Sequence, residues 1–193
     1  MAFSDTQSRQ LKAKLDAQHV KTRKVNGATL NYVEGWHVIA EANRIFGFDG
    51  WDRQTLSSNC IFTGMRAGSH AAAYTATVRV SVRAGEAVVL REGSGTGEAT
   101  AATIGQAHEL ALKGAETDAT KRALATFGNR FGLALYDPDQ AGVTKPRVRL
   151  EQTEDLAGPW LLRTPDTIDE AFTDQDRFAA ALRTAMELSL IHI

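Results

Sequence analysis

The basic pair Lys121–Arg122 is the part of the sequence best suited to contact an anion. On a helix, Asp118 stands four residues before Arg122, a spacing that favours an ordinary ion pair. Lys121 has Thr117 four residues before it and Ala125 four residues after it, so we expect its ammonium group to lack an ion-pair partner. An unpaired lysine on a helix is a candidate phosphate contact. The alternative is a solvated side chain, the usual state of a lysine.

A second candidate is the glycine-rich segment Gly93–Gly97, which reads GSGTG between a predicted strand and a predicted helix. The backbone N–H groups of a glycine loop at a helix start can bind phosphate. No Gly-Lys-Ser/Thr motif follows, and the preceding strands read as hairpins rather than as the parallel strands of a dinucleotide-binding unit. We therefore interpret the segment as a flexible connection. A nucleotide-binding enzyme that uses this segment is kept as an alternative.

The sequence contains no recognisable catalytic or metal-binding motif. Its five histidines lack the spacing of metal ligands, and there is no nucleophile elbow, H-E-x-x-H motif or Cys-His cluster. The single cysteine, Cys60, cannot form a disulfide within the chain, which favours a reducing compartment such as the cytoplasm. We therefore expect a protein that is not an enzyme and needs no cofactor or metal. No apolar run suggests a signal peptide or a membrane span, so we expect no membrane partner.

The basic pair lies near the end of Gly97–Gly132, which we expect to form one long helix. The segment contains no proline and is rich in residues that favour helix. Gly105 and Gly114 lie inside it and should each cost about 1 kcal/mol relative to alanine. A helix that carries these costs should lie close against another backbone. Its apolar stripe of mostly small residues comprises Ile104, Ala107, Ala111, Ala115, Ala119, Ala123 and Phe127.

A sheet is expected before this helix. Residues Tyr74–Arg83 alternate between apolar and polar side chains, which predicts a strand with one buried and one wet face. Further strands are expected at Asp52–Phe62 and Ala87–Arg91, joined to it by turns at Gly64–Ser69 and Ala84–Glu86. Together they form a three-stranded antiparallel meander that leads into the long helix.

The N-terminal part is basic. Residues 9–24 carry six basic side chains and one acidic one, and leucines with helical spacing predict a short helix that ends at Arg23–Lys24. Such an arm is a further candidate for binding phosphates, with a solvated helix as the alternative. Ala28–Val33 then predicts a strand, and Gly35–Phe46 predicts a helix that Gly47 ends.

Composition divides the chain into three parts. We expect a folded domain over residues 1–137, a linker over 138–166 that holds all four prolines, and an acidic amphipathic helix over 167–193. Thr167–Glu170 has the spacing of a capping box that would start this helix. Residues 1–150 carry a net charge of +5 and residues 151–193 a net charge of −6. A basic body suggests an anionic partner, although an ordinary solvated surface would also account for the charge.

Two segments resemble the signatures of the Rad52 family of recombination mediators. The first is residues 35–51, GWHVIAEANRIFGFDGW, and the second is residues 117–129, TDATKRALATFGN. They occur in that family's order and spacing, with a hairpin region and two glycines before the helix. The resemblance covers residues 11–137, and the chain is similar to bacterial or phage members.

This resemblance implies an α+β fold, with a β-β-β-α core made of a three-stranded antiparallel sheet and a long helix. It implies assembly into a ring in which the small-residue stripe is partly an intersubunit surface. It also implies binding of single-stranded DNA and annealing of complementary strands without ATP, in homologous recombination and double-strand break repair. The implied partners are single-stranded DNA, further copies of the chain and a strand-exchange recombinase, in the nucleoid of a bacterial or phage-infected cell. A structural oligomer without DNA affinity is the other alternative.

The resemblance also assigns DNA-binding residues. Lys121 and Arg122 match the family's DNA-contacting pair, and Phe48 matches the aromatic residue of its F-G-aromatic-x-G-W turn. His37 stands where eukaryotic members have an arginine, and Ala125 replaces another arginine. Two lysines of those members are also replaced, which leaves a second, outer DNA site unsupported. The other cations expected to line the groove are Arg44, Arg53, Arg79, Arg83 and Arg130.

Overall fold

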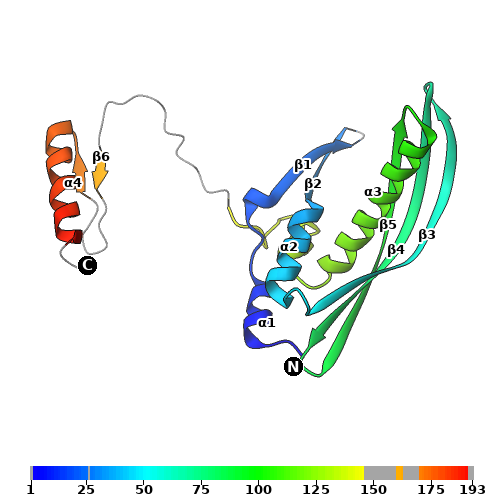
Figure 1. Cartoon of the computed structure of the whole chain (residues 1–193), viewed down its shortest axis with the longest axis horizontal. Coiled ribbons are helices and arrows are strands. Elements are labelled where there is room, and N and C mark those ends of the chain that lie inside the picture. The colour runs from blue at the N-terminus through cyan, green and yellow to red at the C-terminus, as the bar shows by residue number, and fades with distance from the viewer. Residues whose placement is uncertain (1, 26, 146–159, 163–169, 191–193) are drawn as a thin grey trace. The chain divides into compact units, whose positions relative to one another are not determined.

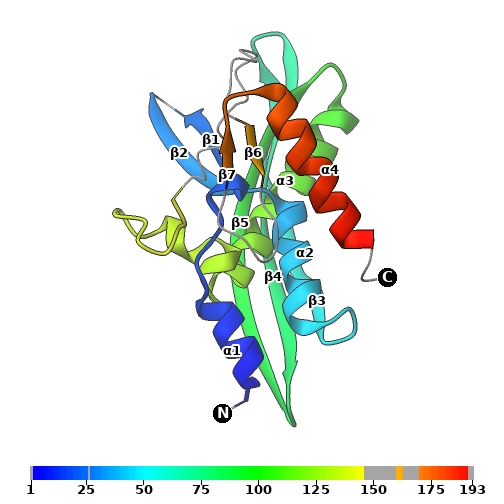
Figure 2. The same ribbon diagram turned by 90° about the vertical axis from the view of Figure 1, so that its left-hand side faces the viewer.

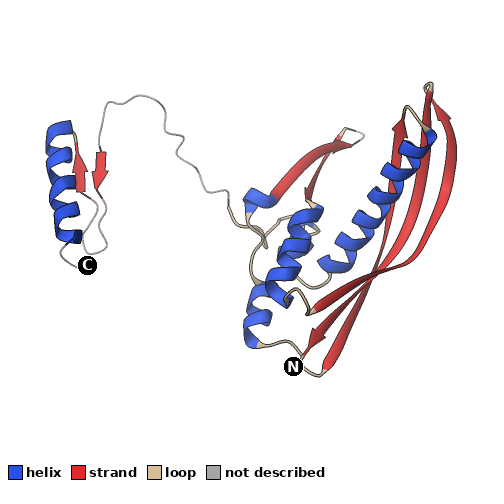
Figure 3. Cartoon of the chain, in the orientation of Figure 1, coloured by secondary structure: helices blue, strands red, loops and turns tan. Residues whose placement is uncertain are grey.

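The structure, a computed structural model, describes residues 2–25, 27–145, 160–162 and 170–190, and it divides the chain into the units Met1–Arg147 and Val148–Ile193 (Figures 1 and 3). The second unit contains β6 (Trp160–Leu162), β7 (Glu170–Phe172) and α4 (Gln175–Leu190). The elements of the first unit are, in chain order, α1 (Asp5–Lys12), the 3₁₀ helix η1 (Ala17–His19), β1 (Val20–Val25), β2 (Ala28–Val33), α2 (Gly35–Phe46), β3 (Trp51–Arg66), β4 (Ser69–Ala84), β5 (Ala87–Ala101), α3 (Ile104–Ala125) and the 3₁₀ helices η2 (Asn129–Phe131) and η3 (Leu133–Leu135).

The main sheet has the strand order β3-β4-β5, and both pairs of neighbours are antiparallel. The central strand β4 alternates as predicted. Val78, Val80 and Val82 have no exposed surface, whereas Arg79 and Ser81 between them are partly exposed. Helix α3 packs against β4 and β5 on the buried face (Figures 1 and 2). The predicted α+β fold, a three-stranded antiparallel sheet packed on a long helix, is confirmed.

Helix α3 approaches the sheet closely because both surfaces lack side-chain bulk. Gly93, Gly95 and Gly97 are alternate residues of β5, and a Cβ atom on any of them would overlap the backbone of α3. The close backbone contact predicted for the helix is therefore confirmed. The alanines of the stripe are buried against the chain's own sheet, whereas Ile104 at its start is exposed, so a partial role of the stripe between subunits stays a prediction. The stripe residues that have no exposed surface are Ala107, Ala111, Ala115, Ala119 and Ala123.

Two boundaries in this region differ from the prediction. Residues Gly93–Gly97 lie inside β5 and are not a loop, so they do not form the phosphate-binding turn considered above. The helix therefore begins only at Ile104, where the Thr103 side chain accepts a hydrogen bond from the backbone N–H of Gln106. Strand β3 likewise continues to Arg66. Glycine normally breaks strand patterns, but here it permits a helix to lie directly on the strand.

The N-terminal basic segment forms a hairpin and not the predicted helix. Helix α1 ends at Lys12, and both Arg23 and Lys24 lie in β1, which pairs antiparallel with β2. Residues 20–25 read VKTRKV, and this alternation with β-branched residues favours a strand over a helix. Gly27 has a φ of 82°, as expected for the turn between the two strands.

Helix α2 forms over the predicted residues Gly35–Phe46, and Gly47 caps it with a φ of 88°. Its last residue anchors the chain that follows α3. The ring of Phe46 stacks on Phe131 at a centroid distance of 5.8 Å and meets Phe127 edge-on at 5.4 Å. This aromatic cluster holds the end of α3 against α2.

Part of the predicted linker packs on the first unit. The backbone N–H of Leu15 donates to the oxygen of Gly142, and the N–H of Thr144 donates to the oxygen of Leu15, both at 2.8 Å. Most of residues 138–166 beyond this contact lie outside the described residues, so the predicted domain division stays a prediction.

In the second unit, β6 and β7 form an antiparallel hairpin that precedes α4. Glu170 lies in β7, so the final helix starts at Gln175 and not at the predicted capping box. Residues 167–169 of that motif are outside the described residues. The rings of Phe172 and Phe178 meet edge-on at 5.8 Å and tie the hairpin to the helix. Among the described helices, none combines the length and apolar character needed to cross a bilayer.

The glycine–alanine contact predicts opposite effects for two glycine-to-alanine substitutions. Gly95→Ala should lower the free energy of unfolding by about 3 kcal/mol or more, because its methyl group would overlap the backbone of Ala119. Gly105→Ala should leave stability unchanged or raise it by up to about 1 kcal/mol, because nothing lies within 4 Å of the new methyl group and alanine favours helix. Urea unfolding of both variants measures this, and equal effects would contradict the proposed close contact.

Candidate nucleic-acid interface

Lys121 projects from α3 towards the end of β2 and is half-buried there. Its Nζ donates to the backbone oxygen of Val33 at 3.4 Å and lies 5.6 Å from the ring centre of Tyr32. Both partners are uncharged. Within the described ranges, no carboxylate lies at ion-pair distance from this ammonium group. Lys121 thus keeps its charge uncompensated by a direct ion pair.

The charge of Lys121 is disfavoured by its surroundings. Burial lowers the pKa of Lys121 below its ordinary value of 10.5; Asp118 opposes this effect, while the positive charges of Arg23 and Arg122 add to it. Three cations therefore lie close enough to repel one another. An anion bound between them would remove that repulsion and restore the charged form of the lysine.

Arg122 forms the ion pair that the sequence predicts. Its Nε donates to Oδ2 of Asp118 at 2.9 Å, and the pair raises the pKa of Arg122 through that hydrogen bond. Its side chain is still 55% exposed. Because a guanidinium group has five N–H donors, Arg122 retains donors for a second anion.

Two hollows meet at these side chains, and we call them together the candidate groove. The first, of about 290 Å³, lies between β2 and the residues from α3 to η3. The second, of about 520 Å³, lies between α3 and the edge of β5 and includes Lys113. The β1–β2 hairpin stands beside α3 along this groove (Figures 1 and 2). The residues that line both hollows are Arg23, Asp118, Lys121 and Arg122.

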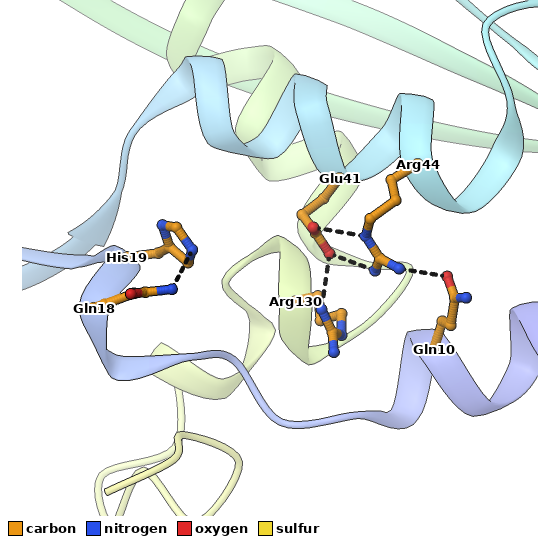
Figure 4. Close-up of polar contacts among 6 residues, drawn as sticks. All are labelled: Gln10, Gln18, His19, Glu41, Arg44 and Arg130. Carbon is orange, nitrogen blue, oxygen red and sulfur yellow. Dashed lines mark hydrogen bonds and ion pairs between the residues drawn. The ribbon is translucent and has the colours of Figure 1, made fainter. Parts of the chain in front are cut away.

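Two of the other predicted cations bind one buried carboxylate (Figure 4). Arg44 donates to both oxygens of Glu41 at 2.9 and 2.7 Å, and Nη1 of Arg130 donates to Glu41 at 3.3 Å. Burial by itself would raise the pKa of Glu41, but the hydrogen bonds and charges of the two arginines lower it below the ordinary value. Arg44 also donates to the side chain of Gln10 at 2.9 Å. These arginines therefore connect α1, α2 and η2.

The three predicted arginines of the sheet are also paired. Arg53 lies 3.3 Å from Glu116, and Arg83 lies 3.5 Å from Asp52. Arg79 donates to Glu92 of the neighbouring strand at 2.6 Å. None of these three lines the candidate groove. Their role in DNA binding stays a prediction.

His37 and Phe48 lie outside the groove as well. His37 is only 7% exposed, and its ring stacks on that of His19 at a centroid distance of 3.9 Å. Phe48 is 87% exposed in the turn between α2 and β3. Of the nine predicted DNA-binding residues, the structure places only Lys121 and Arg122 together in the groove.

The groove also contains Arg23, from the basic arm that is a predicted phosphate-binding candidate, and two tyrosines that are not among the predicted residues. Arg23 and Tyr32 come from the β1–β2 hairpin, and Tyr136 follows η3. Arg23 lies in β1 and not at the end of the predicted helix, in agreement with the alternation in residues 20–25. No local signal marks the two tyrosines, because only the packing of the hairpin on α3 brings them together.

The geometry can be compared with known proteins. Residues 4–152 match the family model described as "Rad52/22 family double-strand break repair protein". The chain belongs to this family. Lys121 and Arg122 fall inside the matched region, as do both signatures that suggested the resemblance. The match extends past residue 137, where the sequence resemblance was expected to end.

Three similar proteins are each named a DNA repair and recombination protein. The chain is 41% identical over 136 residues to the DNA repair and recombination protein RAD52 of Eremothecium gossypii, and 39% identical over 131 residues to that of Saccharomyces cerevisiae. It is 30% identical over 189 residues to the DNA repair and recombination protein rad22 of Schizosaccharomyces pombe. These matches cover 67%, 67% and 94% of the chain, but only 30%, 27% and 39% of the relatives.

The buried His37 predicts a stability that depends on pH. Burial lowers the pKa of His37 below 6.5; His19, Arg130 and Arg44 lower it further, and Glu41 opposes them. As the pH falls below about 6.5, the unfolded chain takes up this proton before the folded one does. The free energy of unfolding should therefore fall, by up to about 1.4 kcal/mol per pH unit, until the folded histidine is protonated too.

The measurement is urea unfolding of wild type and His37→Phe between about pH 7 and pH 5. Phenylalanine keeps an aromatic ring beside His19 but cannot be protonated, so its stability should depend less steeply on pH. His70→Phe, which removes a histidine from β4, serves as the control and should keep the wild-type slope. Equal slopes for wild type and His37→Phe would show that His37 does not titrate differently in the folded state.

Proposed function

We propose that this chain binds single-stranded DNA in the candidate groove and anneals complementary strands without ATP, as a subunit of a homo-oligomeric ring. One observation carries the proposal. Among the residues that the structure describes, half-buried Lys121 has no direct ion pair, and it lies beside a half-exposed Arg122 where two hollows meet. Membership of a family of double-strand break repair proteins supports nucleic acid as the relevant anion.

The arrangement suits a sequence-independent function. Lysine and arginine contacts to phosphates release counterions, and they leave the edges of the bases free to pair. A phosphodiester chain brings one negative charge per nucleotide past the cluster of Arg23, Lys121 and Arg122. Annealing then requires only that two strands be held loosely and close together. No nucleotide hydrolysis is needed, so the protein acts without being an enzyme.

The edge strand β3 supports assembly with other copies. It is 16 residues long, and nearly all of its side chains are exposed on the isolated chain. Long exposed edge strands with apolar side chains are prone to contact other chains. A ring would carry one such groove on each subunit. The weak affinities of the individual grooves for a DNA strand would then combine into a larger overall affinity. The exposed apolar residues of β3 are Leu56, Ile61, Phe62 and Met65.

We also propose that the chain acts together with a strand-exchange recombinase and that it is located in the cytoplasm. The recombinase is suggested by the relatives, which are named DNA repair and recombination proteins. The free and exposed Cys60 fits a reducing compartment. The bacterial or phage origin stays a prediction, and the three relatives named above are fungal.

The basic pair predicts the outcome of an annealing assay. Lys121→Ala/Arg122→Ala should slow ATP-independent annealing of two labelled complementary oligonucleotides at least about tenfold. Because each contact to a single strand contributes about 0.7 to the slope of log affinity against log salt, the slope should fall by about 1.4. The control is Arg177→Ala/Arg183→Ala, which removes the same charge from exposed positions of α4.

The oligomeric size of each variant is compared by size-exclusion chromatography. A control variant that slows annealing as much as the groove variant would show that overall charge, and not the groove, is responsible. If wild type binds no single strand even at low salt, the chain is a structural oligomer without DNA affinity.

The lowered pKa of Lys121 predicts an unusual loss of affinity at alkaline pH. Because burial and the nearby cations lower that pKa below 10.5, Lys121 should lose its proton before an ordinary lysine does. Affinity for single-stranded DNA should therefore already fall in wild type in the pH range below about 10.4, the pKa of an ordinary lysine. Lys121→Arg, which stays protonated, should retain its affinity over this range.

Fluorescence anisotropy of a labelled oligonucleotide measures this, with Lys113→Arg as the control. Lys113 lines the same groove, and its exchange should leave the wild-type alkaline loss in place. If Lys121→Arg and wild type lose affinity in parallel, Lys121 does not contact the bound phosphate in its charged form.

A further inference from the structure

The lining of the first hollow of the candidate groove has two chemically different parts. One part carries the cations Arg23, Lys121 and Arg122. The lining also has an apolar part, which includes Val33, Phe131 and Leu135. A nucleotide has the same division, with a charged phosphate on one side and a flat, largely apolar base face on the other. The volume of about 290 Å³ suits one nucleotide and not a run of bases.

Tyr136 stands at this hollow with its ring unoccupied. Tyr136 is 66% exposed, and its side chain makes no hydrogen bond and no ring contact with any other described residue. It lies near enough to Arg122 to act on the charge of that guanidinium group. A large exposed aromatic ring beside a phosphate-binding cation is the usual arrangement of a base-stacking residue.

The backbone around Tyr136 is held in place. Its N–H donates to the oxygen of Leu133, and the N–H of Leu135 donates to the oxygen of Gly132, both at 3.0 Å. The side chain of Asp137 accepts hydrogen bonds from the backbone N–H groups of Asp139 and Ala141 at 3.1 and 3.0 Å. The ring is therefore carried by an ordered turn, which lowers the entropy cost of stacking on it.

The second tyrosine of the hollow is already engaged. Arg23 and Lys121 each lie 5.6 Å from the ring centre of Tyr32. These contacts orient the two cations and leave Tyr32 less available to a ligand. Tyr136 is therefore the ring with a free face in this hollow.

We propose that the hollow accepts one base of the bound single strand, stacked on the ring of Tyr136, while the adjacent phosphate lies on Lys121 and Arg122. This inference rests on the proposed function and adds a subsite to it. Stacking on a tyrosine tolerates all four bases, so the subsite is compatible with sequence-independent binding. It holds one nucleotide per subunit and leaves the neighbouring bases free to pair.

The test compares two ligands of equal length and equal charge. One is a fluorescently labelled oligo(dT), and the other is the same oligomer made of abasic tetrahydrofuran nucleotides, which keeps the phosphates and lacks the bases. The proteins are full-length wild type, Tyr136→Ala, Tyr136→Phe and the control Leu133→Ala. Leu133 is 43% exposed in η3 but does not line this hollow.

Tyr136→Ala should weaken oligo(dT) binding about tenfold and leave binding of the abasic oligomer unchanged. Tyr136→Phe, which keeps the ring, and Leu133→Ala should bind both ligands as wild type does. Equal effects of Tyr136→Ala on both ligands, or no effect on either, would overturn the inference while leaving the proposed function intact. If wild type binds neither ligand at low salt, the proposed function itself fails.

Discussion

The contact on which the rest of the structure depends is the direct packing of α3 on β5 through alanine and glycine. Gly93, Gly95 and Gly97 allow the helix backbone to lie where side chains would normally stand. The five alanines of the stripe are fully buried in this interface. Such an interface has little side-chain entropy to lose, but it tolerates almost no added volume, because backbone cannot move aside as a side chain can. It therefore fixes both the position and the rotation of the helix.

This rotation determines which residues of α3 face the groove. The buried stripe occupies every fourth position up to Ala123, so Thr117, Asp118, Lys121 and Arg122 fall outside this stripe, on the side of the helix that faces the groove beside the edge of β5. The β1–β2 hairpin covers part of that side and half-buries Lys121 against Val33. The candidate groove is therefore a consequence of the helix–sheet contact together with a hairpin, and not of the local sequence around the basic pair.

The sequence predicts the repetitive parts of the fold well. The alternation in β4, the helix Gly35–Phe46 and the ion pair of Arg122 with Asp118 all depend on neighbours within a few residues, and each is confirmed. Errors occur where tertiary packing overrides local preference. The glycines of β5 resemble a loop when read alone, because the reason for their presence, the backbone of α3, lies in another element. In the same way, an arginine count cannot distinguish Arg44, which holds buried Glu41, from a cation that is free for a ligand.

The ion pairs of the first unit affect how strongly the candidate groove can attract an anion. Five of the predicted arginines form ion pairs with carboxylates elsewhere in the first unit, so part of their charge is neutralised there. In the groove itself, Asp118 partly neutralises Arg122, while Lys121 remains unpaired but costly to keep charged. For the proposed function, we expect a single groove of this composition to bind a phosphate chain with only moderate affinity. Moderate affinity is what annealing requires, since a strand that is held too tightly cannot shift its register while it searches for its complement. In the proposed ring, tight retention of the whole strand then comes from the number of subunits, and each individual contact remains weak enough to exchange.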